Sequence, residues 1–550
     1  MKTLHDELRA SPDDESMWLV FADALLEKGD VRGEIITLRH RLDTAVLPPE
    51  QLDAITWRIH EIEATSHWQW HHEVRHLPAE ELHWQAGFVR GVRLSYGPAT
   101  EETLATWLDH PAGALLTTLE FLEDRSLGNE QASALAGWPV LQRLTELRLR
   151  RTAIGGPGAR ALASSPFVSR LRRLDLHSNH IHAEGLRALV QSESLRGLVH
   201  LDVGNNLLDE TATVALARGG MADLESLDLS SNHIGTEGVR TLSRSEALPR
   251  LTSLELGRNH LDDEAARALS HAPFWPQLHS LNLSNNRLGD KGANALATVE
   301  APALRLLRLQ NNVLGPQGAQ ALVGAGLVSQ LRHLDLRGNR LGPAGATALS
   351  QATNQNLSVL VLNANEIGDT GLRMLATSSL MGGLIELSLG RNHIGDRGIQ
   401  ALARAPGLAL RSLHLWHNDL GPLGASVLAK CPSLLYLGHL DLGGNRIGSE
   451  GVTAIARSEH LSRLMSLELW HANVGDAGAE ALATADHLKR LRHLDLSYNF
   501  ISDCGAVALS KASWLGHVKT LVLRRNDIGQ DGRDALRRAA QDHPGLRIEL

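Results

Sequence analysis

The sequence predicts an α/β fold, a right-handed solenoid in which each repeat contributes one short strand and one helix. The same frame of residues returns along the chain, as in Leu278, Leu281, Leu283, Asn286 and Leu288, and a short alanine-rich segment follows it. A fixed period of this length is the signature of stacked repeats. The asparagine of the frame recurs every 26 or 27 residues with one position skipped: Asn179, Asn206, Asn232, Asn259, Asn286, Asn312, Asn339, Asn365, Asn392, Asn418, Asn445, Asn499 and Asn526.

The strand of each repeat is predicted from alternating side chains. In Leu281, Asn282 and Leu283, the two leucines face the core and the residue between them faces outward. The asparagine that follows sits where the chain turns off the strand, and its amide can donate to and accept from backbone groups of neighbouring turns. Thr152 and Ala472 occupy this position in two repeats, so we expect the ladder to be interrupted there.

The helix of each repeat is predicted from its start and its composition. Segments such as residues 292–297 combine good helix formers with small side chains that pack closely on the strands. Adjacent strands lie about 4.8 Å apart, whereas packed helices need about 8 to 10 Å, so stacked repeats should curve into a horseshoe with a concave parallel sheet and convex helices. The expected N-cap and first-turn residues are Asp290, Asp369, Asp396, Asp476, Asp503, Thr236, Ser449, Pro316, Pro343 and Pro422.

The frame LxxLxLxxNxLG resembles the leucine-rich repeat of the ribonuclease-inhibitor-like class over residues 141–550. Residues 84–140 contain the strings FVRGVRL and LLTTLEF, which we interpret as degenerate capping repeats. The final LRIEL predicts one more strand at the end of the array.

Residues 1–83 lack the asparagine ladder and predict a separate α-helical cap domain, with two short helices separated by Gly29 and Asp30. This segment resembles the small repeat-companion domain that precedes leucine-rich repeats in myxobacterial and planctomycete proteins. Trp84, Gly87, Phe88 and Gly91 continue the resemblance, which implies a cap or a second docking surface. The residues that carry it first are Leu19, Val20, Phe21, Ala22, Asp23, Leu26, Glu27, Gly29, Asp30, Arg32, Gly33 and Glu34.

Composition narrows the classes of function. The chain has 550 residues, 43% of them hydrophobic, and a formal net charge of −8, so we expect no nucleic-acid partner and no anionic membrane partner. No stretch of about 18 apolar residues and no apolar leader occurs. The two cysteines, Cys431 and Cys504, lie in different parts of their repeats and predict no disulfide framework. We therefore expect a cytoplasmic protein of bacterial type, whose partner and oligomeric state stay open.

One motif indicates enzymatic chemistry. His72, Glu73, Val74, Arg75 and His76 form HExxH, which on a helix places two zinc ligands beside a general base. Pro78 and the Trp/His-rich stretch at 68–71 instead predict a connector. Phosphate-binding and nucleophile-elbow motifs do not occur. We predict no catalytic residues, no cofactor and no metal, and a zinc hydrolase is the third interpretation.

Charged residues gather at the exposed middle position of several strands. An acidic run of Asp175, Asp202, Asp228 and Glu255 predicts an electrostatic contact with a basic partner, although the frame itself also favours LDL. A basic patch could seat an acidic segment or a phosphate, or be a solvated face: Arg148, Arg150, Arg151 and Arg173. Histidines at exposed phases predict either a pH-sensitive interface or polar filler: His177, His200, His333, His414, His439 and His493.

Aromatic residues mark the C-terminal third. Trp416 with His417 and Trp470 with His471 follow their strands at the same phase, two repeats apart, and Tyr498 follows one repeat later. We predict a two-sided aromatic cleft over Gly443 and Gly444 beside Asp441, Glu468 and Asp495, with burial under a loop as the alternative. Such residues are typical of interface hot spots, and strand-end aromatics grip the partner in the ribonuclease inhibitors that the frame resembles.

The predicted function is a protein-protein interaction module that binds a protein partner on the concave face, with no catalysis of its own. The alternative is a regulator of a partner enzyme, in the manner of the leucine-rich Ran GTPase-activating proteins. No residue in the sequence identifies that activity.

Overall fold

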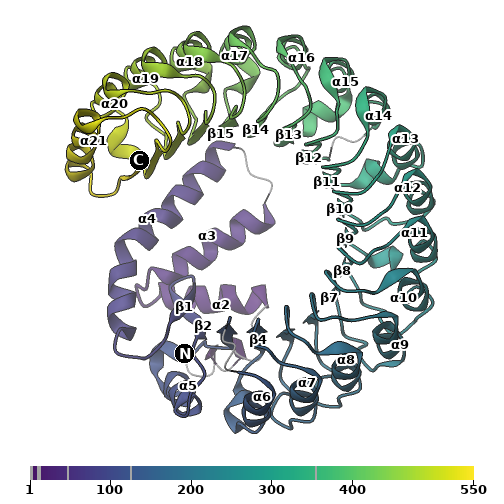
Figure 1. The fold of residues 1–550 in the computed structure, drawn as a ribbon. Helices are drawn as coiled ribbons and strands as arrows, with labels where there is room; N and C mark the ends of the chain where they lie inside the picture. Colours follow the sequence, from purple (N-terminus) through teal and green to yellow (C-terminus); the bar gives the residue numbers. More distant parts are fainter. Residues whose placement is uncertain (1–3, 6, 9–13, 46–48, 124–126, 354–355) are drawn as a thin grey trace. The chain divides into compact units, whose positions relative to one another are not determined.

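The computed structural model describes the whole chain except residues 1–3, 6, 9–13, 46–48, 124–126 and 354–355. The chain divides into two compact units, which we describe separately. The N-terminal unit contains Met1–Ile234 and Ser245–Leu251, and the C-terminal unit contains Gly235–Arg244 and Thr252–Leu550. Strands and helices alternate in both units, as the repeat frame predicts (Figure 1).

The N-terminal unit begins with helices, continues with the β1–β2 pair, and then alternates strands with helices. Its strands are β1 (Glu81–Gln85), β2 (Phe88–Arg93), β3 (Thr118–Leu122), β4 (Glu146–Arg150), β5 (Arg173–Asp175), β6 (His200–Asp202) and β7 (Ser226–Asp228). Its helices are α2 (Glu15–Leu26), α3 (Arg32–Thr44), α4 (Pro49–Val74), α5 (Thr100–Asp109), α6 (Asn129–Ala136), α7 (Gly156–Ala163), α8 (His182–Val190) and α9 (Glu210–Arg218).

The C-terminal unit repeats one three-residue strand and one helix throughout. Its strands are β8 (Ser253–Glu255), β9 (Ser280–Asn282), β10 (Leu306–Arg308), β11 (His333–Asp335), β12 (Val359–Val361), β13 (Glu386–Ser388), β14 (Ser412–His414), β15 (His439–Asp441), β16 (Ser466–Glu468), β17 (His493–Asp495), β18 (Thr520–Val522) and β19 (Arg547–Glu549). Its helices are α10 (Gly235–Leu242), α11 (Asp263–Leu269), α12 (Asp290–Ala297), α13 (Pro316–Gly324), α14 (Gly342–Leu349), α15 (Gly368–Ala376), α16 (Asp396–Leu402), α17 (Pro422–Ala429), α18 (Gly448–Ala456), α19 (Gly475–Ala483), α20 (Asp503–Leu509) and α21 (Gln530–Asp542).

Neighbouring strands pair in parallel, with each repeat in register with the next. In the N-terminal unit, β2 to β7 form one parallel series. In the C-terminal unit, β8 to β19 form another, which confirms the strand predicted at the end of the chain. Within this unit the strands line the inner side of an arc and the helices line its outer side (Figure 1). The fold class is therefore the predicted leucine-rich solenoid.

The predicted asparagine ladder is present and fully hydrogen-bonded. Buried Asn392, for example, donates from Nδ2 to the carbonyls of Leu362 at 2.8 Å and Leu389 at 3.0 Å. Its Oδ1 accepts from the backbone N–H groups of Asn365 at 2.9 Å and Ile367 at 3.3 Å. One side chain thus satisfies backbone groups of its own repeat and of the preceding one, which a buried turn requires.

The two interruptions of the ladder differ in consequence. Thr152 replaces part of the amide, because its Oγ1 donates to the carbonyl of Leu149 at 2.9 Å. Ala472 still donates its backbone N–H to Asn499 Oδ1 at 2.8 Å. The alanine side chain has no amide group that could donate to carbonyls of the preceding repeat. The hydrogen bonds of the ladder are therefore lost on that side only.

The aspartates at the helix starts lie in the first turn as predicted, but they cap the next repeat rather than their own. Asp369 stands in the first turn of α15, and its Oδ1 accepts from the N–H groups of Gly395 at 2.7 Å and Gly398 at 2.9 Å, where α16 begins. A Cβ on Gly398 would stand 2.7 Å from that oxygen. The carboxylate therefore needs a glycine opposite it to reach the positive end of the neighbouring helix.

The N-terminal helices enclose their own small core. Phe21 and Ile35 are fully buried, and a Cβ on Gly33 would lie 2.5 Å from the carbonyl of Ala22, so α2 and α3 pack with direct backbone contact. Arg32 forms an ion pair with Asp30. Among the residues that carry the resemblance to the companion domain, Phe21, Ala22 and Gly33 are therefore packing residues, whereas Val20 and Leu26 are exposed.

A hairpin that the sequence did not predict joins this core to the repeats. β1 pairs antiparallel with β2 through a tight turn at Ala86 and Gly87, whose φ angles are 49° and 79°. Positive φ at both central residues is the geometry of a type I′ hairpin turn. Helical periodicity in the preceding residues does not reveal such a short strand.

Candidate functional site

The HExxH motif does not form a metal site in the described part of the chain. α4 extends to Val74, so His72 is helical and the connector predicted from the Trp/His-rich stretch is wrong. Pro78 disfavours helix only at the residue before it, which leaves the stretch at 68–71 free to continue α4. His76 lies beyond the helix end with its ring 5.3 Å from that of His110, whereas the ring of His72 packs on Trp68 at 5.2 Å. Among the described residues, His72 and His76 do not belong to any group of three ligands within metal-binding range.

We call the eight predicted partner-binding residues the C-terminal surface. They lie on the strands β15 to β17 and in the turns after β14, β16 and β17: Trp416, His417, Asp441, Glu468, Trp470, His471, Asp495 and Tyr498. Parallel pairing places Asp441 opposite Glu468 and Glu468 opposite Asp495. Three carboxylates therefore stand side by side on successive strands. Asp441 is only 8% exposed.

The aromatic rings of this surface rest on glycines of neighbouring repeats. A Cβ on Gly390 would stand 2.4 Å from the indole of Trp416, and a Cβ on Gly443 would stand 2.2 Å from that of Trp470. Each indole therefore lies directly over a glycine of the preceding repeat. The sequence provides the space for both rings, because any larger residue at these glycines would displace them.

The predicted aromatic cleft is occupied by His417, which contacts both neighbours. Its ring lies 5.8 Å from Trp416 and 4.9 Å from Trp470, with edge-to-face geometry in both pairs. The rings therefore form a continuous shelf instead of two separated walls. Tyr498 extends it beyond His471 and is 52% exposed. Burial under a loop, the alternative for the aromatic residues, does not describe Tyr498.

The carboxylates beside this shelf carry charge that nearby cations do not balance. Burial, together with repulsion from Glu468 and Asp495, raises the pKa of the Asp441 carboxyl to about 7. The imidazole of His414 lies beside this group, with its Nδ1 4.0 Å from Asp441 Oδ2. Burial lowers the pKa of the His414 imidazole. No arginine or lysine in the described ranges forms an ion pair with the three carboxylates.

The four residues of the predicted acidic run lie on strands of both compact units. Asp175, Asp202 and Asp228 stand in register on β5, β6 and β7 of the N-terminal unit. Glu255 belongs to β8 of the C-terminal unit, where it accepts a hydrogen bond from Asn282 Nδ2 at 2.5 Å. Three residues of the predicted run therefore belong to the N-terminal unit and the fourth belongs to the C-terminal unit, and contact of the run with a basic partner stays a prediction.

Three arginines of the predicted basic patch form ion pairs with these acids and their neighbours. Arg150 donates from Nε to Asp175 at 2.8 Å and from Nη2 to Asp202 at 3.0 Å. Arg148 pairs with Glu146 at 2.7 Å, and Arg151 pairs with Glu123. Arg148, Arg150 and Arg151 therefore form ion pairs within the unit while their side chains stay partly exposed. Whether the patch seats an acidic segment or a phosphate, or is a solvated face, stays a prediction.

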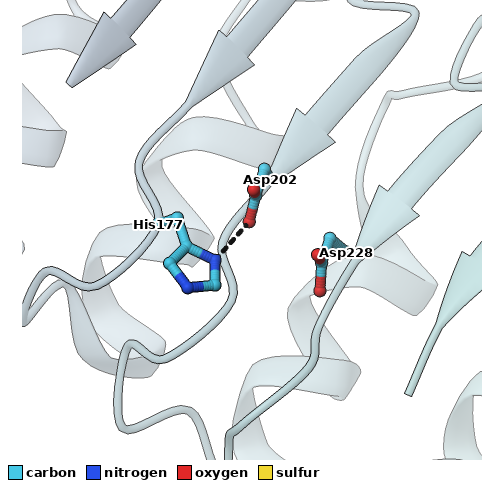
Figure 2. Close-up of side chains that lie close together, drawn as sticks. All are labelled: His177, Asp202 and Asp228. Atoms are coloured by element: carbon cyan, nitrogen blue, oxygen red, sulfur yellow. Dashed lines mark hydrogen bonds and ion pairs between the residues drawn. The ribbon is translucent and has the colours of Figure 1, made fainter. Parts of the chain in front are cut away.

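His177 turns the three acids into a mixed cluster. Its Nδ1 lies 3.1 Å from Asp202 Oδ1, and this hydrogen bond raises the pKa of the imidazole (Figure 2). Burial and the charge of Asp202 raise the pKa values of the Asp175 and Asp228 carboxyls. Sequence reasoning named His177 and the acids separately and did not combine them.

The two clusters share one position of the repeat, which we call a column, and the predictions from sequence did not recognise this. The position two residues before each ladder position carries His177, Trp416 and, in the repeat where Ala472 replaces the asparagine, Trp470. Gly390 and Gly443 occupy it in the repeats before the two tryptophans. Gly204 occupies it in the repeat after His177. A large ring beside a glycine in this column marks both clusters.

Comparisons with known proteins agree with this repeat architecture. A family model described as a leucine-rich repeat matches thirteen segments that cover more than half of the chain: residues 141–163, 170–190, 221–243, 248–270, 276–297, 330–350, 353–376, 384–403, 410–429, 434–456, 460–483, 487–510 and 517–536. No protein in the curated collection matches the sequence. No described helix combines the length and the hydropathy that a membrane span requires.

Solved structures of similar fold come from bacteria and yeast. An internalin from Listeria monocytogenes is 20% identical, with a TM-score of 0.40 over 67% of this chain and 93% of its own. A leucine-rich-repeat protein of Leptospira interrogans is 20% identical, with a TM-score of 0.39 over 84% of this chain and 96% of its own. A chain from the complex of Rad7 and Elc1 in yeast is 18% identical, with a TM-score of 0.43 over 62% of this chain and 83% of its own. On the thirteen matched segments, the chain belongs to the leucine-rich-repeat family.

Proposed function

We propose that this protein is an interaction module without catalysis of its own, and that it binds a protein partner through the C-terminal surface. Leucine-rich repeats are typical of protein-protein interaction modules. The observation that carries the proposal is the aromatic shelf of Trp416, His417 and Trp470 beside the carboxylates of Asp441, Glu468 and Asp495. Aromatic side chains anchored in place and flanked by charge are the composition of binding hot spots.

The chemistry of the surface favours a partner segment rich in lysine or arginine. Three neighbouring carboxylates share no cation from the described chain, and Asp441 is held with a raised pKa of about 7. A guanidinium or ammonium group from outside would relieve that repulsion and would also stack on the indole faces. Electrostatic complementarity of this kind increases the rate of association and rejects acidic proteins.

We further propose that the repeats are of the ribonuclease-inhibitor-like class and that residues 1–83 cap the array. Short strands that alternate with single helices in every repeat of the C-terminal unit support the class. The core of the N-terminal helices includes Ala86 and Leu115, with Phe88 packed against it, so it continues into the first strands as a cap requires.

The proposal is tested by removing the two tryptophans. The full-length Trp416→Ala, Trp470→Ala double variant should keep its native circular dichroism and lose retention of an immobilised arginine-rich peptide and of the partner captured from host lysate. Trp57→Ala, Trp68→Ala is the matched control, because both residues are strongly exposed on α4, at 64% and 75%. Equal binding by both double variants would refute the surface. A collapse of the melting temperature in the first variant would show that the tryptophans are core residues.

A further inference from the structure

The cluster of His177, Asp202 and Asp228 has the composition and the convergence of a metal-binding site. One ligand atom from each residue lies within 4.8 Å of the other two. His177 comes from the turn after β5, and the two aspartates come from the ends of β6 and β7. Figure 2 shows the imidazole and both carboxylates directed into one space. The cluster lies far in sequence from the C-terminal surface and has no role in the function proposed above.

The closest pair already has the separation of two ligands on one ion. Zinc binds imidazole nitrogen and carboxylate oxygen at roughly 2.0 to 2.2 Å, so two adjacent ligands stand about 3.0 to 3.5 Å apart. His177 Nδ1 and Asp202 Oδ1 are 3.1 Å apart. A bound ion would take the place of the proton that these two atoms share, and Asp228 would close the third position by rotation of its side chain.

The surroundings hold the ligands in place and leave room for the ring. Asp202 Oδ1 accepts from the N–H of Gly204 at 2.9 Å, and Asp228 Oδ1 accepts from the N–H of Ser230 at 2.7 Å. A Cβ on Gly204 would stand 2.6 Å from His177 Nδ1. Backbone donors that fix ligating carboxylates, and small residues beside a ligating ring, are the supporting contacts that metal sites use.

Charge also favours a cation at this place. The carboxylates of Asp175, Asp202 and Asp228 stand on successive strands, and Arg150 bridges the first two. In the part of the chain that the structure describes, Asp228 forms no ion pair with an arginine or lysine. A divalent ion between Asp202 and Asp228 would balance the negative charge of the carboxylates that Arg150 does not neutralise. The imidazole selects among ions, because Ca²⁺ and Mg²⁺ prefer oxygen ligands whereas Zn²⁺ accepts nitrogen.

We propose that His177, Asp202 and Asp228 form a binding site for a divalent transition-metal ion of the Zn²⁺ type. The remaining coordination positions are open to solvent, because none of the three residues is fully buried. Such a site would fix the ends of three successive repeats to one another.

Zinc titration of the chelator-treated full-length protein, followed by competition with a chromophoric chelator, tests the site. The parent should bind one equivalent of Zn²⁺ that Ca²⁺ does not displace. His177→Ala and Asp228→Asn should each lose that equivalent. His493→Ala is the matched control, because the chain has 28 histidines and His493 lies on β17 of the C-terminal unit, far from the cluster in sequence. This variant should keep the zinc equivalent.

A second variant separates ligation from folding. Gly204→Ala keeps all three ligands but crowds the imidazole, so it should weaken zinc binding by about 10- to 100-fold, as loss of a supporting contact does, while circular dichroism stays native. Equal zinc affinity and stoichiometry in the parent, His177→Ala and Gly204→Ala would show binding to dispersed surface histidines and would overturn the proposal. Displacement of the zinc by Ca²⁺ would also overturn it.

Discussion

The charge of Asp441 should make the protein less stable at neutral pH than it would be with a neutral side chain at this position. Asp441→Asn tests this. The carboxyl pKa is raised from 3.8 to about 7 by burial and by the charges of Glu468 and Asp495. Asparagine keeps the shape of the side chain and can still accept the hydrogen bond from the N–H of Gly443, which is 3.0 Å from Asp441 Oδ1. The substitution therefore removes the charge with little other change.

The sign and size of the effect follow from the two pKa values. Between pH 3.8 and about 7, folded Asp441 holds a proton that the unfolded chain releases, so the free energy of unfolding falls as pH rises through this window and stays low above it. Each pKa unit is worth about 1.4 kcal/mol, which sets a ceiling of about 4 kcal/mol. We expect Asp441→Asn to be about 2 to 4 kcal/mol more stable than the parent at pH 8, and the difference to shrink to about 1 kcal/mol or less at pH 4.5.

Urea unfolding at pH 4.5, 6 and 8, followed by circular dichroism, measures the difference. Asp419→Asn is the control, because its side chain is 70% exposed in the same unit; a change there should stay within about 0.5 kcal/mol at every pH. A stability difference for Asp441→Asn that is the same at all three pH values, or that is largest at pH 4.5, would refute the argument that the buried charge is the cause.

Two further substitutions test the fold that carries these surfaces. Asn392→Ala removes the partners of four buried backbone groups, so we expect the free energy of unfolding in urea to fall by about 2 to 4 kcal/mol. The control, Asn294→Ala on the exposed face of α12, should leave it almost unchanged. Equal effects of the two substitutions would contradict the stabilising role of the ladder. Phe21→Ala should destabilise the N-terminal helices by about 3 to 5 kcal/mol, because Phe21 is fully buried, and hydrogen exchange should show the loss in α2 and α3. Val20→Ala, 52% exposed, should leave that exchange unchanged.

Residues that repeat in sequence made the fold predictable. The asparagine period fixes where each strand ends, and the leucines that flank it fix which face is buried, so the strand-helix order followed from the frame. The β1–β2 hairpin did not follow, because its signal is a two-residue turn at Ala86 and Gly87 rather than a periodic pattern. The capping by Asp369 was also missed, since its carboxylate bonds to glycines about one repeat away, and only the stacking distance between repeats brings them together.

The candidate residues were predictable one at a time, but their partners were not. Trp416 and Trp470 were found from their phase, whereas the position of His417 between them depends on rotamers that the repeat frame does not specify. Arg150 was expected to face solvent as a cation, yet the register places it between Asp175 and Asp202. Contacts across repeats require the register of the strands as well as the identity of the residues.

Some residues differ from the repeat frame in ways that lower the stability of the fold. Binding of a partner gives a reason for these residues. At a position two residues before the ladder asparagine, a glycine gains no packing of its own, yet Gly443 lies directly under the ring of Trp470. At the end of β15, Asp441 is only 8% exposed and buries a carboxyl group whose charge a neutral residue would avoid. Both departures occur within the same few repeats, and both create something that the fold alone does not need: an exposed aromatic shelf and an unbalanced negative charge. Because a protein gains from such features only when a partner covers them, their coincidence on β14 to β17 is a stronger argument for a binding surface than either feature alone.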